Sequence, residues 1–171
     1  PAMAAGERAG LFADINPDIA AQVPEQYRPS SGKWTGVAAR ATVFAYNKDM
    51  LTPDQLPASL LDLQQPQWQD RWGAPPAKAD FQAIMAALLQ LEGEEVTQQW
   101  LEGMKANAKI YDNNITTLKA VNSGEVAGGV VYHYYWFRDQ AETQEISGNT
   151  GLHYFRNQDP GAFVSISGGG A

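Results

Sequence analysis

The sequence contains no cysteine, only two histidines and few charged residues, and each of these features excludes or disfavours some classes of function for the protein. Without cysteine there are no disulfides, thiolate metal sites or cysteine nucleophiles. Twelve Lys and Arg residues stand against nineteen Asp and Glu, which gives a net charge of −7. A chain this acidic, with no basic run, is not expected to bind nucleic acid. No apolar run approaches the ~18 residues of a membrane-spanning helix, so the chain is not expected to span a membrane.

The common catalytic motifs are also missing. The sequence has no GxGxxG after a strand, no GxxxxGK[ST], no HExxH and no GxSxG. Its carboxylates are scattered, so nothing indicates the carboxylate pair of a glycosidase. We therefore expect no enzyme, and an enzyme of unrecognised type remains only a minor alternative.

What the sequence does have is enough apolar residues for a packed core and an alternation of strand-like and helical segments. Hydrophobic residues make up 44% of the chain and aromatic residues 11%, which is enough for a packed core. The length of 171 residues fits one domain or two small lobes. The alternation favours an α/β layer with mostly parallel strands. The expected strands are 34–46, 72–75, 109–111, 126–132, 152–155 and 162–166, and the main expected helices are 80–90, 94–106, 114–123 and 133–142.

An unusual run of six ring-bearing residues, Tyr132 to Phe137, follows the buried-type strand 126–132. The run can serve core packing alone, because aromatic side chains bury large areas. Alternatively, Tyr134 and Tyr135 lie where a strand ends and a helix begins, the edge at which α/β sheets bind ligands. Tyrosine is protonated at neutral pH, and a hard trivalent metal ion would displace that proton and stabilise the phenolate.

Several segments, in order and nearly end to end, resemble the periplasmic ferric-iron-binding proteins of bacterial iron ABC transporters, which have a type II periplasmic-binding fold. The set is specific, above all the YYW step after a GEV-apolar strand and the later DPGA. The matching segments are Ala9–Ala13, GVAARATVFAYN (36–47), SLLDLQQPQWQDRWG (59–73), LEGEEVTQQWLEGMKANAKIYDNN (91–114), LKAVNSGEVAGGVVYHYYWFR (118–138) and QDPGAFVSISGGGA (158–171).

The resemblance implies an α/β fold with a mostly parallel sheet flanked by helices and crossing strands of a second, incomplete lobe. It implies a partial first lobe and crossing strand in 1–45, a second lobe in 46–157 and a return strand in 158–171. Ferric ion would be held in the interlobe cleft by the phenolates of Tyr134 and Tyr135. Arg40 and Asn114 would bind a synergistic anion such as phosphate or carbonate. From the residues alone, Arg40 also suits a surface ion pair and Asn114 an ordinary helix N-cap.

The sequence departs from the family pattern at several positions near the expected site, including Phe81, which cannot ligate a metal where some relatives have a tyrosine. A small-residue segment that meets the anion in relatives is replaced here by residues 77–81. In it Asp80 would repel an anion or serve as an N-cap, and Lys78 would replace lost amide donors. Tyr132 stands where an Asn is common, either as an additional phenol of the site or as strand packing.

As a family member, the chain is expected in the periplasm as a monomer that delivers ferric ion to the permease of an inner-membrane ABC transporter. The alternative is a binding protein for another small anionic solute, with structural tyrosines. The chain begins without methionine and stops in a glycine-rich strand, so we expect a fragment. The fragment lacks the amino-terminal His or acidic ligand of the family and should bind iron weakly.

Overall fold

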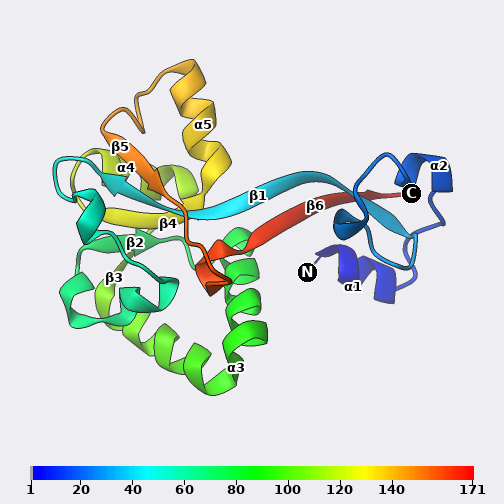
Figure 1. The fold of residues 1–171 in the computed structure, drawn as a ribbon, viewed down its shortest axis with the longest axis horizontal. Helices are drawn as coiled ribbons and strands as arrows, with labels where there is room; N and C mark the ends of the chain where they lie inside the picture. Colours follow the sequence, from blue (N-terminus) through cyan, green and yellow to red (C-terminus); the bar gives the residue numbers. More distant parts are fainter. Residues whose placement is uncertain (1) are drawn as a thin grey trace. The chain divides into compact units, whose positions relative to one another are not determined.

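The computed structural model describes residues 2–171 (Figure 1). Contacts within the chain divide it into two compact units, which are described separately. Unit 1 consists of the residues up to Arg40 together with Val164–Ala171, and unit 2 consists of Ala41–Phe163. Within the described residues, no helix has both the length and the apolar character needed to cross a membrane.

The sheet of unit 2 is built around a parallel core of three strands. Strand β2 (Trp72–Ala74) pairs in parallel with β3 (Ala108–Ile110) on one side and with β4 (Gly128–Tyr132) on the other. Strand β1 (Trp34–Asn47) then joins β4 antiparallel, with Thr42 opposite Tyr132, and β5 (Thr150–His153) pairs antiparallel with β1. The expected α/β layer is confirmed, and β1 is the strand that enters it in the opposite direction.

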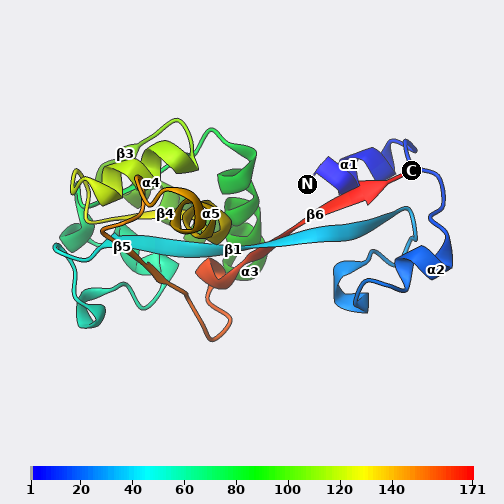
Figure 2. The same cartoon turned by 90° about the horizontal axis from the view of Figure 1, so that it is seen from above.

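Helices cover both faces of this sheet. Phe44 and Val130 point to the face covered by α3 (Ala79–Asn107) and the 3₁₀ turn Leu60–Gln64, whereas Val43 and Val131 point to the opposite face. The opposite face carries α4 (Asn114–Asn122) and α5 (His133–Glu142), which lie on one side of β1 in Figure 2. The alternation along β1 and β4 follows from the two-residue period of a strand.

Local sequence signals explain where the helices begin and end. The two helices expected on either side of Gly93 form one kinked element, α3, because Gly93 alone departs from helical geometry, with φ 85°. Helix α5 has the expected limits. The N-cap of α4 is Asn113, whose side chain accepts from the Thr116 amide, so the expected Asn114 cap is wrong by one residue. Similarly, the N-cap of α3 is Lys78, not Asp80.

Unit 1 is made of short elements around two strands. It contains α1 (Ala2–Arg8), α2 (Pro17–Ala20), the first part of β1 and strand β6 (Val164–Gly170). Strand β6 begins two residues after the expected position because Pro160–Ala162 forms a 3₁₀ turn. It pairs with β1, and Ile166 lies against Gly36, where a larger residue would not fit.

Candidate metal centre

Three helix starts meet at one edge of the unit 2 sheet. Strands β3, β2 and β4 are adjacent and parallel, so their carboxyl ends lie at the same edge, and they lead into α4, α3 and α5 respectively (Figure 1). Ligands of α/β proteins bind at this kind of edge. Asp80, Asn114 and the tyrosine pair all lie in the first turns of these helices.

Tyr134 and Tyr135 lie together at the start of α5. Their ring centroids are 4.0 Å apart and the ring planes are inclined by 32°. Both residues are half-buried and pack against the main core of unit 2. Successive residues of a regular helix point about 100° apart. The first helical turn nevertheless brings the two rings together.

The Asp80 carboxylate lies beside the tyrosine pair. Its Oδ2 atom accepts a hydrogen bond from the Tyr135 hydroxyl at 3.4 Å and another from Asn114 Nδ2 at 3.0 Å. Asp80 belongs to the first turn of α3, where the helix dipole favours a negative charge. The site in unit 2 therefore combines two phenols and one carboxylate, all of them hard oxygen donors.

Asn114 is 4% exposed and uses both ends of its amide. Its Oδ1 atom accepts from the Tyr132 backbone amide at 3.3 Å, while its Nδ2 donates to Asp80. The side chain thus links the last residue of β4 to the first turn of α3. The donor that the sequence assigned to an exogenous anion is directed at a carboxylate of the protein itself.

Tyr132 is buried and directs its hydroxyl to the main chain of α3. The hydroxyl donates to the Asp80 carbonyl oxygen at 3.0 Å, and only 1% of the residue is exposed. This geometry favours a role in holding Asp80 in place over a role as an additional metal ligand. Lys78 is exposed at the N-cap position of α3.

Arg40 is the last residue of unit 1 before the boundary and is half-buried on β1. Its assignment to an anion stays a prediction, as does the assignment of Tyr134 and Tyr135 to a metal. Among residues 2–171, no group of three or more His, Asp or Glu side chains is gathered as a metal site.

The far end of α5 is fixed by a separate carboxylate, Asp139. Burial opposes its ionisation, but hydrogen bonds from Ser147, Thr143 and the Ile146 amide outweigh this effect and lower the pKa of Asp139. The charged side chain ties the loop after α5 back to the helix. The tyrosine pair is therefore carried by a helix that is anchored at its carboxyl end.

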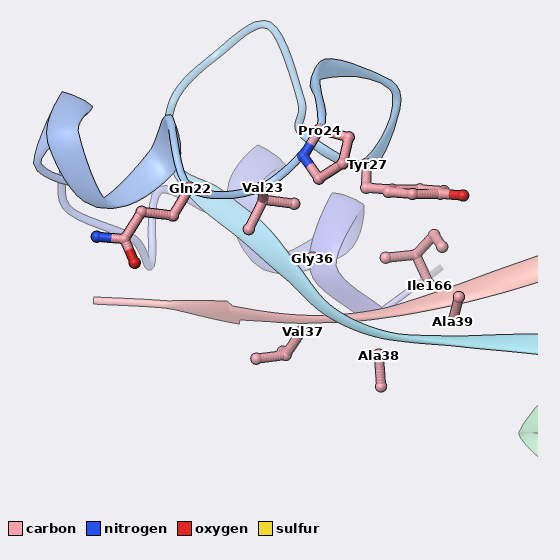
Figure 3. Close-up of a pocket in the computed structure, with 9 residues that line it drawn as sticks. All are labelled: Gln22, Val23, Pro24, Tyr27, Gly36, Val37, Ala38, Ala39 and Ile166. Carbon is pink, nitrogen blue, oxygen red and sulfur yellow. The ribbon is translucent and has the colours of Figure 1, made fainter.

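Unit 1 has a cavity of its own with a different character. It encloses about 280 Å³ and is lined largely by apolar groups, with Val23, Tyr27 and Ile166 around it (Figure 3). None of its lining residues is charged. This cavity offers no carboxylate to a metal ion, in contrast to the edge of the unit 2 sheet, where Asp80 lies.

Sequence reasoning missed how Asp80 is used. Asp80 was expected to repel an anion or to cap a helix, whereas it accepts from Asn114 and Tyr135. The contact depends on the order of the strands in the sheet, which the sequence does not display directly. If β3, β2 and β4 are taken as parallel neighbours, residues in the first turns after them must converge.

Comparison with known proteins identifies the family. Residues 1–168 match the family of bacterial extracellular solute-binding proteins. The chain belongs to this family. It is 57% identical over 170 residues to the Fe(3+)-binding periplasmic protein of Serratia marcescens, covering 99% of this chain and 50% of that protein. It is 33% identical over 135 residues to the major ferric iron-binding protein of Neisseria meningitidis serogroup B, covering 79% and 41%.

The fold comparison agrees with the sequence comparison. The crystal structure of iron-bound HitA from Pseudomonas aeruginosa superimposes with a TM-score of 0.90 at 42% identity, over 95% of this chain and 53% of that one. The resemblance to periplasmic ferric-iron-binding proteins and the type II periplasmic-binding fold are thereby confirmed. The chain spans about half the length of the curated relatives it matches.

Proposed function

We propose that this chain is the tyrosine-bearing part of a solute-binding component of a ferric-ion importer. The observation that carries the proposal is the pair of phenol rings 4.0 Å apart beside the Asp80 carboxylate. Hard oxygen donors without thiols suit ferric rather than ferrous ion. The ion would displace the hydroxyl protons of Tyr134 and Tyr135 to solvent and bind the two phenolates.

The Asp80 carboxylate supplies a third anionic oxygen in this proposal. Asn114 donates to it, so the position that the sequence assigned to phosphate or carbonate already has an anion in unit 2. An exogenous anion bound by Arg40 would then be an addition to the site and not a requirement. The negative carboxylate also attracts the positive ion. The start of α3 accommodates this negative charge, because the helix dipole is positive there.

The names of the relatives support a cellular role for this chain as well. Their names describe periplasmic and ferric-iron-binding proteins, so we propose a periplasmic monomer that passes ferric ion to the permease of an ABC transporter. The family is one of solute-binding proteins, which supports binding and delivery over catalysis.

The test is a titration of the full-length protein with ferric and with ferrous ion against a competing chelator, in buffers with and without phosphate. Ferric ion should bind more tightly and give the visible charge-transfer band of an iron phenolate. Tyr134→Phe and Tyr135→Phe should each weaken ferric binding about 100-fold or more, because each removes an anionic donor while keeping the ring. The removal of charge by Asp80→Asn should weaken binding in both buffers.

Tyr154→Phe is the matched control, since Tyr154 lies in the same unit, is 37% exposed and belongs to none of the three helix starts. It should leave the band and the affinity unchanged. Equal or tighter ferrous binding would contradict the proposal. An unchanged band in both tyrosine variants would leave them as packing residues and favour a different anionic solute.

A further inference from the structure

The histidine that precedes the tyrosine pair makes a contact far along the chain. The Ala41 backbone amide donates a hydrogen bond to His133 Nδ1 at 3.1 Å. This nitrogen accepts, so the ring proton is on Nε2. The ring also meets Phe137, one turn further along α5, edge to face with centroids 5.8 Å apart. His133 is thus held by its own helix and bonded to strand β1.

The imidazole takes the place of a strand carbonyl. In the β1–β4 ladder Thr42 is opposite Tyr132, so a continued antiparallel pairing would put Ala41 opposite His133. The backbone of His133 has already turned into α5 and cannot continue the ladder. Its side chain satisfies the Ala41 amide instead, which avoids the cost of an unpaired backbone donor.

The bond lies where the chain passes from unit 2 to unit 1. Ala41 is the first residue of unit 2 and Phe163 the last, and the neighbouring Thr42 amide donates to the Phe163 carbonyl at 3.0 Å. The chain therefore leaves unit 2 at two places, Ala41 and Phe163. Ala41 makes the hydrogen bond to His133, and Phe163 is hydrogen-bonded to Thr42, the next residue. The His133 bond therefore connects β1, at the boundary residue Ala41, with the first residue of α5.

We propose that His133 is a positioning residue that sets the orientation of Tyr134 and Tyr135 through the Ala41 amide. The proposal rests on the proposed function of the tyrosine pair. A purely structural His133 would affect only folding. A positioning His133 also affects the geometry of the two phenolates, because that geometry would depend on the hydrogen-bond acceptor at position 133. Hinged proteins change shape at a few residues between their bodies, and Ala41 lies at such a boundary.

The experiment compares His133→Leu, which removes the acceptor, with His133→Asn, whose Oδ1 can replace Nδ1, in the full-length protein. The first readout is hydrogen exchange of the Ala41 amide by NMR, which needs no iron. The second is the ferric affinity together with the wavelength of the charge-transfer band. If the Leu variant does not fold, His133→Gln, which moves the acceptor one bond further, takes its place.

We expect the Leu variant to raise Ala41 exchange about tenfold or more, to weaken ferric binding about tenfold and to shift the band, with Asn restoring all three. Faster Ala41 exchange with wild-type affinity and band would overturn the inference while the proposed function stands. Failure of Asn to restore the band would also overturn it. A wild-type protein without any ferric band would refute the proposed function, and the inference with it.

Discussion

The two units of the chain differ in how much of their own surface they bury. Every buried apolar side chain of the described residues lies in unit 2, between Val43 and Pro160. Both units expose some large apolar side chains, but those of unit 1, including Val37 at 75% and Leu11 at 71%, have no buried core beside them among the described residues of the same unit. A unit this small rarely forms a sufficient core by itself.

The comparison shows which part of the candidate site depends only on this chain. In unit 2 the helix starts that hold Asp80, Asn114 and the tyrosines are fixed by the core and by hydrogen bonds among themselves. Arg40 belongs to the unit that lacks such a core. The tyrosine half of the site is therefore expected to be preformed, whereas unit 1 needs surface from outside these 171 residues.

The largest expected effect is the difference in ferric affinity between this chain and the full-length protein. A hinged site binds tightly because two bodies contribute ligands and close around the ion. Unit 2 alone offers two phenols and one carboxylate, and water would fill the remaining positions. We expect the 171-residue chain to bind ferric ion at least about 10⁴-fold more weakly and to lose it to citrate.

Calorimetry of both forms in one buffer, with the same anion present, measures this difference. Comparable affinities would show that the groups in unit 2 suffice, and that the second body contributes little binding energy.

The second prediction concerns the core of unit 2. Trp100 is fully buried, packs against Trp72 and Phe81, and donates from its indole N–H to the Leu60 carbonyl at 2.8 Å. Trp100→Ala should lower the free energy of unfolding of unit 2 by about 4 kcal/mol, because it leaves a cavity and an unpaired carbonyl. Urea denaturation measures the change. A loss below about 1 kcal/mol would mean that unit 2 has no fixed core.

The elements of unit 2 were largely predictable, because periodicity and turn residues specify local structure. The sequence predicted α5 and β1 closely, and Gly93 marked the break in α3. The tyrosine pair was also visible as a pattern. The meeting of Asp80 with Asn114 was not, because it depends on the order in which β3, β2 and β4 are placed side by side.

Single hydrogen bonds were beyond prediction for a related reason. Asn113 and Asn114 are the same residue type, and only the backbone path decides that one caps α4 while the other binds Asp80. The His133–Ala41 bond joins residues 92 positions apart and depends on strand register. Register depends on which strands are neighbours and which face of each is buried, and local sequence patterns do not identify the neighbouring strand.

The third prediction concerns the negative charge of Asp139, which accepts hydrogen bonds from the loop after α5. Asp139→Asn should destabilise unit 2 by about 1–2 kcal/mol at neutral pH, since hydrogen bonds from Thr143 and Ser147 lose their charged acceptor. The pKa of Asp139 is lowered in the folded state. The extra stability of the wild type over Asp139→Asn is therefore fully present above the unfolded pKa of about 3.9. It should disappear as pH falls through the lower folded value.

Thermal unfolding of both proteins between about pH 2 and pH 7 measures this dependence. A difference in Tm that stays constant down to the lowest pH would show that the charge of Asp139 is not what holds the loop.

The smallest effect is expected in unit 1. Val37 is 75% exposed on β1, so Val37→Ser removes almost no buried surface from this chain. We expect its free energy of unfolding to change by no more than about 0.5 kcal/mol, as for other exposed positions. In the full-length protein the same substitution should cost about 1 kcal/mol or more if the additional chain covers this strand. Parallel urea titrations of the two forms decide between these cases. An equally small change in both would mean that Val37 stays exposed in the full-length protein, and that the missing surface of unit 1 is supplied elsewhere.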